Sequence, residues 1–448
     1  MTVLPGQGNL GFYGAQPLAA RPRPPVAPSS LPDSAEPFAT VVLQDVGQGL
    51  GPTVAPGAVK RLAVVQEIEK AGLADVSKRA FGFQFPVVSC GATYAPKKVW
   101  GYVDVAPDGS AAFKVPAGVP IYFIALDANG MAVQRMRSFT HLMPGEVQGC
   151  VGCHEPRTQS PQRQLAAAPL GNPQDLRPPE WGTQGFCFSR VVQPVLDKHC
   201  VECHNPLQKL GKVDLSGDRT DYFNVAYETL ARRNQGRTGS PLVSWIPTYN
   251  GQEWNILEIR PKFWGSPASR LAELILAGHP DANGKPQIHM DDAAKRRVLM
   301  WIDLNVPYYG TADTAHPELP ACRQMFPKEL TRVMDGVYAR RCESCHTAKK
   351  VSMLTTWRQV KWSDGLGSWG GMGLRIENPQ RNDFLLAPLA KKSGGTEACG
   401  QAVFGDTSDP DYQAVLKTFA PIAQLMAQRP RMDMPNPAPP CCPSGDVD

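Results

Sequence analysis

The sequence predicts a multidomain α+β protein, in which a small antiparallel β-sandwich-like domain is followed by two mainly α-helical domains. Three observations support this fold class. Short apolar runs separated by Asp-Gly and Asn-Gly turns occupy the region before residue 140. Later in the chain, an apolar stripe with helical spacing occurs twice, and each copy runs into a Cys-x-x-Cys-His sequence. The length of 448 residues leaves room for about three domains.

Residues 1–58 are rich in proline and glycine and show little periodicity, so we expect an N-terminal segment without a core of its own. It would be the end of a domain that the chain lacks. The start has no basic residues and no apolar stretch, so we expect no secretory signal there and infer that the chain is a fragment or that its true start lies upstream. No apolar run approaches the ~18 residues of a membrane helix, so the chain is expected not to be transmembrane.

Residues 59–157 are expected to form the β domain. Strands at 100–105 and 112–115 flank an Asp-Gly turn, and strands at 119–126 and 131–136 flank an Asn-Gly turn. These dipeptides between apolar runs are strong hairpin signals, so each pair of strands should form an antiparallel hairpin.

A Pro/Gln-rich linker is expected at 158–182, followed by helical domains at 183–312 and 313–448. The first has an apolar stripe from Phe188 to Leu196, and the second has one from Phe326 to Tyr338. In each domain a later helix is expected to open at a Ser-Pro or Asn-Pro pair and to end at a glycine. Those residue types are typical of helix starts and ends.

Three Cys-x-x-Cys-His motifs carry the chemistry. Such a motif binds haem because its two thiols add to the vinyl groups of one porphyrin edge, and its histidine becomes the proximal iron ligand. We therefore expect three covalent c-type haems, and both helical domains should be cytochrome c-like. The thioether residues are Cys150, Cys153, Cys200, Cys203, Cys342 and Cys345, and the proximal ligands are His154, His204 and His346.

A Cys-x-x-Cys pair also occurs in zinc sites and in redox dithiols, and a zinc scaffold without haem is our third hypothesis. Here every pair carries an immediate histidine, which favours haem. Because c-type haem is attached outside the cytoplasm, we expect a periplasmic or extracellular bacterial protein. The net charge of +5 without a Lys/Arg-rich run does not suggest a partner nucleic acid. The expected partner is a redox protein, and other subunits of a multihaem complex are further candidates.

The sixth ligand of the second haem should come from the loop ahead of the helix that starts near Asp291. This loop holds His289 and His279, and we favour His289, then His279. Either would give bis-His coordination and a lower potential than His/Met coordination. The alternative is that both histidines are solvent-exposed loop residues.

For the third haem, Met434 followed by proline resembles the methionine loop of small cytochromes c, with Met432 and Met372 as weaker candidates. The alternative is that Met434 fills a gap in a core. The first motif follows a turn and not a helix, and no module-like distal ligand lies near it. Its iron is therefore the candidate for an open, reactive site, unless His141 or a distant residue fills the sixth position.

Six further cysteines, an even number, are typical of an oxidising compartment with some disulfides. Cys322 and Cys399 are candidates for one disulfide, and Cys441 with Cys442 for stapling the tail to the body. For Cys90 and Cys187 we expect pairing, burial or metal binding, and the sequence does not decide between them.

The runs Gly118-Val-Pro-Ile-Tyr-Phe, Gln134-Arg-Met-Arg-Ser138 and Cys150-Val-Gly-Cys-His-Glu155 resemble the haem-bearing middle region of the hydrazine synthase alpha subunit and its relatives. The resemblance continues through Trp301-Ile-Asp-Leu-Asn-Val-Pro-Tyr-Tyr-Gly310 and covers roughly residues 60–312, and residues 313–448 add a further haem module. It implies that the haem on Cys150 and Cys153 is reactive. It also implies that the haem on Cys200 and Cys203 is a relay ligated by His204 and His289 or His279.

The chain departs from that family at one position. There the motif histidine turns away to bind zinc and a tyrosine four residues later binds iron, whereas here that residue is Thr158. We therefore expect His154 to bind iron in the ordinary way and do not expect hydrazine synthesis. The first functional hypothesis is a multihaem cytochrome that carries electrons. The alternative is a haem-dependent oxidoreductase of the hydrazine-synthase-alpha-like family that acts on a small nitrogen or oxygen species at the first haem.

Overall fold

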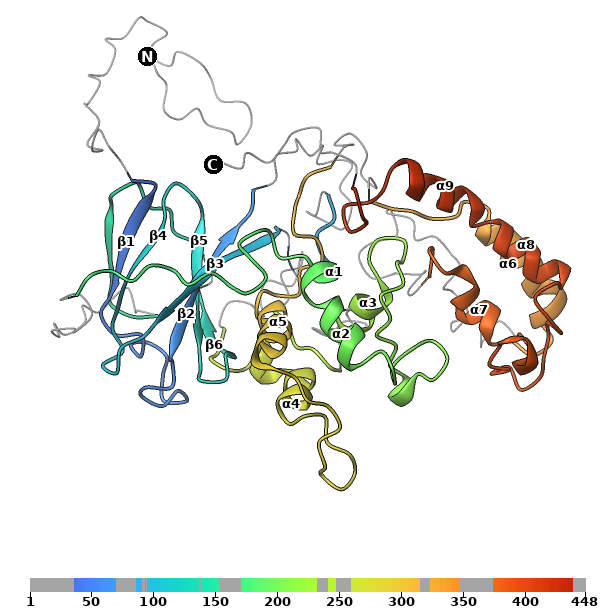
Figure 1. The fold of residues 1–448 in the computed structure, drawn as a ribbon, viewed down its shortest axis with the longest axis horizontal. Coiled ribbons are helices and arrows are strands. Elements are labelled where there is room, and N and C mark those ends of the chain that lie inside the picture. The colour runs from blue at the N-terminus through green and yellow to red at the C-terminus, as the bar shows by residue number, and fades with distance from the viewer. Residues whose placement is uncertain are drawn as a thin grey trace, which may run out of the picture.

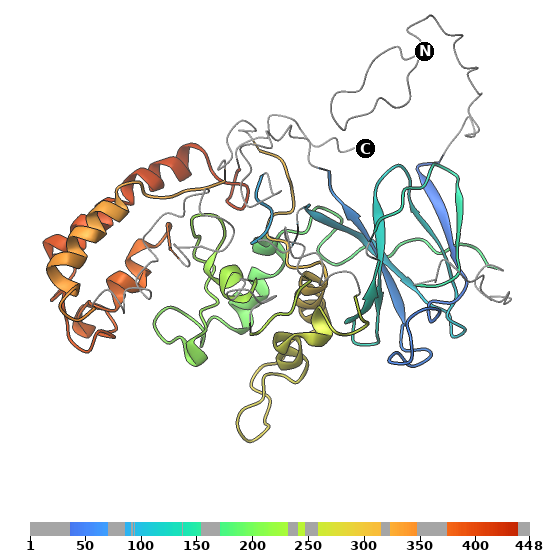
Figure 2. The same ribbon diagram turned by 180° about the vertical axis from the view of Figure 1, so that it is seen from behind.

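The structure, a computed structural model, describes residues 36–69, 86–90, 93, 95–136, 138–153, 171–231, 241–246, 259–314, 323–346 and 374–437. Figure 1 shows three parts in a row: a β domain, a helical region between residues 188 and 303, and a second helical region between residues 330 and 428. Figure 2 shows the same order from behind. The chain is thus a mixed α+β protein with a β domain followed by helical regions, as the sequence predicts.

The β domain consists of two sheets. Its described strands are β1 (Phe38–Leu43), β2 (Arg61–Glu67), β3 (Lys97–Asp104), β4 (Ala111–Pro116), β5 (Ile121–Leu126), β6 (Ala132–Arg135) and β7 (Val147–Cys150). The first sheet has the order β4-β1-β7, and the second has the order β3-β2-β5-β6. Neighbouring strands run antiparallel, except that β1 and β7 are parallel.

The predicted hairpin at 119–126 and 131–136 is confirmed, because β5 and β6 pair antiparallel with Ile124 opposite Arg135. The predicted hairpin at 100–105 and 112–115 is wrong in its pairing. Both strands exist, but β3 pairs with β2 and β4 pairs with β1. The Asp108 turn, in which Ser110 N–H donates to the Asp108 carboxylate (3.0 Å), therefore carries the chain from one sheet to the other.

β1 lies inside the 1–58 segment, for which the sequence predicted no core. Its alternate residues Ala39, Val41 and Leu43 are buried, which is the period of a strand with one covered face. β1 is the middle strand of its sheet, so residues 38–43 belong to the β domain.

The second sheet is buried on both faces. Leu62 and Val64 belong to the apolar core between the two sheets, whereas Val65 and Tyr122 belong to a core shared with the helices. Successive residues of a strand point to opposite faces, so one sheet supports both cores. The β domain and the first helical region are consequently joined by a continuous apolar interface.

The helices are short. Those described are α1 (Phe188–Val191), α2 (Gln193–His199), α3 (Val225–Ala231), α4 (Arg270–Leu276), α5 (Asp292–Asp303), α6 (Leu330–Val337), α7 (Asp383–Leu386), α8 (Pro410–Lys417) and α9 (Ala420–Gln428). Asp291 caps α5 by accepting from Ala294 N (2.7 Å), and Asp409 caps α8 by accepting from Asp411 N (2.9 Å). None of the described helices has the length and apolarity that crossing a bilayer would require.

Both predicted apolar stripes are confirmed as buried helix faces. Phe188, Val195 and Leu196 are buried on α1 and α2, and Leu330 and Val337 on α6. The helix predicted after residue 266 is α4, preceded by one 3-10 turn. The helix predicted after residue 378 is split, because a 3-10 turn precedes α7 and α7 is only four residues long.

Asp303 joins the β domain to the first helical region. It is fully buried at the end of α5, and its carboxyl accepts from Ser266 N (2.7 Å), Ser266 Oγ (2.8 Å) and Ala132 N on β6 (3.1 Å). Gly265 is required beside it, because its φ is +67° and a Cβ there would lie 2.5 Å from Asp303 Oδ1.

This carboxyl predicts a pH-dependent stability. Burial raises the pKa of Asp303 from 3.8 to about 7, although the three donors oppose the shift. The folded protein therefore holds a proton that the unfolded chain releases, so this contribution to stability is present below pH 3.8 and is lost as the pH rises to about 7. We expect the free energy of unfolding in urea to fall by at most about 1.4 kcal/mol per pH unit in that window. Asp303→Asn should flatten the slope, and an unchanged slope in this variant would contradict the prediction.

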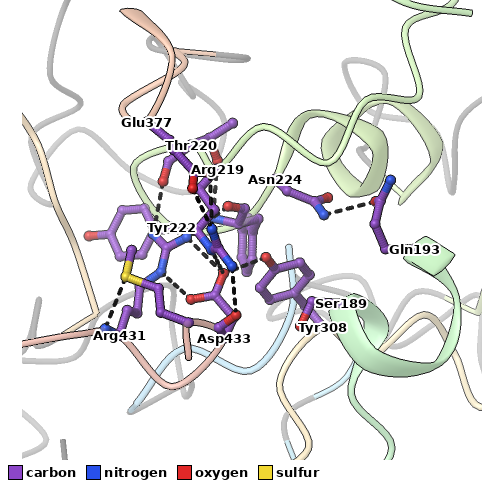
Figure 3. A network of polar contacts seen from close by, with 12 residues as sticks. Ser189, Gln193, Arg219, Thr220, Tyr222, Asn224, Tyr308, Glu377, Arg431 and Asp433 are labelled. Atoms are coloured by element: carbon purple, nitrogen blue, oxygen red, sulfur yellow. Dashed lines mark hydrogen bonds and ion pairs between the residues drawn. The ribbon is translucent and has the colours of Figure 1, made fainter. Parts of the chain in front are cut away.

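Two buried arginines join the second helical region to the first. Arg375 Nε donates to Asp218 (3.0 Å), and its Nη2 donates to Asp214. Figure 3 shows the other contact, in which Arg431 Nε donates to Asp433 (2.7 Å) and the hydroxyl of Tyr308 donates to the same carboxylate (2.6 Å). Arg431 also donates to the carbonyls of Thr220, Asp221 and Phe223, each at 2.8 Å.

Candidate functional site

The first Cys-x-x-Cys pair lies at the end of an edge strand. Cys150 is the last residue of β7 and lies opposite Leu43 of β1. Beyond the strand, Cys150 O accepts from Gln44 N (2.9 Å), and Cys153 N donates to Gln48 O (3.1 Å). The backbone of residues 44–48 thus fixes both cysteines, whereas His154 lies outside the described residues.

Gly152, between the two cysteines, is required by this close approach. A Cβ at this position would lie 2.3 Å from Gln48 Cβ and 2.6 Å from Gln48 O. Such distances are far below van der Waals contact, so a larger residue would push the motif away from residues 44–48.

A pocket opens beside these cysteines. Its cavity volume is about 100 Å³, which is smaller than the roughly 300–1,000 Å³ usual for ligand pockets. Phe113 and Phe123 meet edge to face in its wall, with ring centroids 5.5 Å apart. Apart from Gln134 and Arg135 the wall is apolar. The lining residues are Val41, Leu43, Leu62, Phe113, Phe123, Ala125, Gln134, Arg135, Met136, Cys150, Gly152 and Cys153.

Two of the motif thiols, those of Cys153 and Cys200, are not activated. Burial raises the pKa of Cys153 to about 12 and that of Cys200 to about 11. A redox dithiol needs a lowered thiol pKa, because the thiolate is the nucleophile. These environments therefore do not favour the dithiol reading. Within the described residues no cluster of three or more His, Cys, Asp or Glu side chains is placed to hold a metal ion.

The second and third motifs adopt the same turn. In the second, Cys200 O accepts from Cys203 N (3.2 Å) and from His204 N (3.0 Å). In the third, Cys342 O accepts from Cys345 N (3.1 Å) and from His346 N (2.9 Å). In each, the turn presents two sulfurs and the histidine directly after a helix, which is what attachment of one porphyrin edge requires.

His204 of the second motif faces His279. Their ring centroids are 6.1 Å apart, and the ring planes are inclined by 54°. Two imidazoles on opposite sides of one metal ion, with bonds of about 2 Å to nitrogen, have centroids about 6 Å apart. His204 Nδ1 is also buried and has no hydrogen-bond partner among the described residues. The pair therefore fits two axial ligands of a haem held at Cys200 and Cys203.

The loop after α4 places His279 in this position. Gly278 has a φ of +74° and His279 a φ of +50°, so two consecutive residues are left-handed. A Cβ at Gly278 would lie 2.9 Å from Pro286 Cβ, and the His279 N–H donates to Leu274 O (2.6 Å). A left-handed histidine costs about 1 kcal/mol or more and persists where the surroundings impose it, often at functional sites.

His289, the first choice from the sequence, lies in another environment. Its described interactions include His199, whose pKa is lowered by burial, by the Lys198 charge and by His289, while Asp291 opposes the shift. The geometry thus favours His279 over His289 as the partner of His204. The signal that separates the two in the sequence is Gly278, which permits the reversal after α4.

The third motif follows a π-helical turn at Tyr338–Cys342, in which Glu343 N donates to Tyr338 O (3.0 Å). The Tyr338 hydroxyl donates to His346 O. Arg340 and Arg341 form ion pairs with Asp411 on α8. Single π-helical turns are frequent at functional sites. Residues 347–373, including Met372, lie outside the described residues.

Met434 lies in a small apolar cluster with Met325, Ile376 and Ile422. Its Sδ accepts from Arg431 N (3.3 Å), within the network of Figure 3. Met432 packs against the core of the first helical region. The structure thus brings Met434 to the joint between the helical regions. Its role as an iron ligand stays a prediction.

The remaining described cysteines differ in burial. Cys90 is buried, and its Sγ contacts Ala231 O at 3.1 Å. Cys187 is buried at the start of α1, with Sγ 3.2 Å from Ser189 Oγ. Cys399 is exposed, and together with burial it raises the pKa of Cys342. The predicted partners Cys322, Cys441 and Cys442 lie outside the described residues, so the two disulfide predictions stay predictions.

Sequence reasoning missed the buried charged network at the joint between the helical regions. Arg431 and Asp433 flank Met432, and Arg219 bridges Asp433 (3.9 Å) and Glu377 (2.8 Å). No local pattern marks these side chains as buried, because their partners come from distant parts of the chain.

Comparison with known proteins identifies the β domain. The family model described as "Hydrazine synthase alpha subunit middle domain" matches residues 57–155. Among solved structures, a chain of Kuenenia stuttgartiensis hydrazine synthase is similar, with 18% sequence identity and a TM-score of 0.42. The match covers 60% of this chain and 43% of that chain, so this chain spans less than half of its length. No curated protein matches.

The matched region holds β2 to β7 and the whole first motif, including the pocket-lining Cys150 and Cys153. The family resemblance predicted from the sequence is confirmed here. Residues 57–155 are thus similar to the hydrazine synthase alpha subunit middle domain.

Proposed function

We propose that this chain is a haem-dependent oxidoreductase of the hydrazine synthase alpha-like family, with c-type haems attached at its three Cys-x-x-Cys-His motifs. The observation that carries the proposal is the pocket in the matched domain, where Cys150 and Cys153 border a mostly apolar cavity of about 100 Å³. A cavity of this kind beside two cysteines suits a porphyrin edge held by thioethers.

The first haem is assigned as the reactive centre. The described lining of its pocket includes no histidine, so it offers no second imidazole to the iron. When bound there, haem supplies an iron that exchanges electrons with a small nitrogen or oxygen species. The apolar wall around Phe113 and Phe123 limits water near the porphyrin and raises the cost of unpaired charge.

The second haem is assigned as an electron relay. His204 and His279 would be its axial ligands, and bis-His coordination leaves no position for substrate. The third haem would be held by Cys342, Cys345 and His346, with Met434 retained as the sequence-based candidate for its sixth ligand. The helical regions that carry these motifs would then be cytochrome c-like.

The buried Arg375 and Arg431 contacts hold the two relay modules in one arrangement. Fixed spacing suits transfer between haems, and the terminal haem would exchange electrons with a redox partner protein or with another subunit. Attachment of c-type haem places such a protein in the periplasm or outside the cell.

The second candidate is an electron-transfer cytochrome without catalysis. The facing imidazoles of His204 and His279 fit this candidate as well, because both axial positions of that haem would be filled. The two candidates differ only at the first haem. An open iron there supports the oxidoreductase, and a six-coordinate iron supports the carrier.

The test is made on protein produced in a host that attaches c-type haem. We expect three haems per chain, one of them high-spin in EPR and able to bind CO when reduced. The double variant Cys150→Ser/Cys153→Ser should lose the CO-binding haem, and the matched control Cys342→Ser/Cys345→Ser should keep it. Three low-spin haems that do not bind CO would favour the electron-transfer cytochrome. A chain whose mass shows no added porphyrin would reject both candidates.

A further inference from the structure

Three side chains with buried, unused hydrogen-bond donors gather on the helix-facing side of the second sheet, and of these Tyr122 and Trp264 are buried whereas Arg135 is partly exposed. The hydroxyl of Tyr122, the indole Nε1 of Trp264, and Nε and Nη1 of Arg135 are buried and have no hydrogen-bond partner in the described structure. Tyr122 lies on β5, Arg135 ends β6, and Trp264 comes from the segment just before α4. The β domain and the first helical region both contribute to this cluster.

The guanidinium of Arg135 lies among these aromatic groups. Its Cζ is 5.8 Å from the ring centroid of Tyr122 and 5.6 Å from that of Trp264. Arg135 is opposite Ile124 in the β5–β6 ladder, so it shares the sheet face of Tyr122, two residues from Ile124. The three groups are therefore neighbours in space.

The charged groups described around the cluster leave the positive charge of Arg135 unbalanced. Lys97 Nζ lies 5.6 Å from the Tyr122 ring centroid, but Lys97 is paired with Glu67. Within the described residues no carboxylate forms an ion pair with Arg135, so one positive charge has no counter-ion.

These unused groups determine which ligand would fit. Arginine and the tryptophan indole can only donate hydrogen bonds, and burial raises the pKa of the Tyr122 phenol so that it stays protonated. Each buried donor without an acceptor costs about 1–3 kcal/mol, and more when it is charged. A ligand that relieves this cost must bring oxygen acceptors and a negative charge.

We propose that Arg135, Tyr122 and Trp264 form a binding site for an oxyanion of the carboxylate type. Arg135 is also among the residues that line the pocket of Cys150 and Cys153, whereas Tyr122 and Trp264 belong to the core on the helix-facing side of the sheet. The carboxylate has two sources: a propionate of the haem at the first motif, or a free small oxyanion. The first source rests on the proposed function, and the second does not.

The free-anion source is tested by thermal unfolding with sodium formate titrated against sodium chloride at constant ionic strength. We expect formate to raise the melting temperature, and Arg135→Gln to abolish this response. Tyr122→Phe removes a single oxygen and should weaken formate binding about tenfold or more. Should Arg135→Gln not fold, the result with Tyr122→Phe decides the test. The control is Tyr102→Phe on β3, because the Tyr102 hydroxyl is also buried without a partner but its electrostatic neighbours include Glu180 and Arg296.

The propionate source is tested by a redox titration of the holoprotein. Arg135→Gln should lower the midpoint potential of the first haem, because a positive charge near a haem favours the reduced state, and formate should then have no effect on the wild type. Tyr102→Phe should leave that potential unchanged.

The proposal is overturned if formate raises the melting temperature of the wild type and of the variants equally. It is also overturned if Arg135→Gln and Tyr122→Phe change neither the melting response to formate nor the midpoint potential of the first haem. Failure of the proposed function is a separate result. If no haem is attached at Cys150 and Cys153, the formate titration alone decides, and it can be run on Cys150→Ser/Cys153→Ser protein.

Discussion

The His279→Ala variant should convert one of the three proposed haems from low-spin to high-spin and make it bind CO when reduced. The reason is the 6.1 Å separation between the His204 and His279 rings, which fits two axial ligands of the second haem. Removing one imidazole leaves five-coordinate iron, because a methyl group cannot ligate. EPR of the oxidised protein and CO difference spectra of the reduced protein measure the change.

The matched control is His289→Ala, which removes the other loop histidine and should leave all three haems unchanged. A second variant, His279→Gly, relieves the left-handed backbone strain while removing the same ligand, so it separates coordination from folding. If the spectrum changes in His289→Ala and not in His279→Ala, the order predicted from the sequence is right and the assignment from the structure is wrong.

Arg375→Met should destabilise the joint between the two helical regions by about 3–5 kcal/mol, because it leaves the buried Asp214 carboxylate without its cation and Asp218 with only the half-exposed Arg381. Asp214 and Asp218 are both buried, and Arg375 donates to each of them. Chemical denaturation and limited proteolysis of the second helical region measure the loss.

Arg381→Met is the matched control. Arg381 also contacts Asp218 (3.3 Å), but its side chain is half-exposed, so the loss should be at most about 1 kcal/mol. Adding Asp214→Asn and Asp218→Asn to Arg375→Met should recover part of the stability, because the stranded charges disappear. Equal losses of stability in Arg375→Met and Arg381→Met would show that the buried contacts of Arg375 do not hold the two helical regions together.

The sequence predicts local features well where a short pattern has one physical solution. The helical stripe beginning at Phe188 must bury one face, and the turn before Gly130 must close a hairpin, so both are found. The Asp108 turn fixes only a reversal of the chain. Whether its strands then pair depends on which apolar faces meet, and here they join different sheets.

The site is predictable to the same extent. The cysteine spacing specifies the three motifs. The choice between His279 and His289 depends on two consecutive left-handed residues, of which the sequence marks only Gly278. The Arg431 network and the cluster around Arg135 join residues from distant segments. Their burial follows from tertiary packing, so no local rule could have found them.

The parallel contact between β1 and β7 has a consequence for biogenesis. These strands lie near the two ends of the domain sequence, so the ribosome releases β1 long before Cys150 and Cys153. Closing so long a loop is slow, and pairing of this kind comes late in assembly. An enzyme that attaches porphyrin to this motif would therefore act on it while the segment is still unfolded, and the pairing of β1 with β7 would follow.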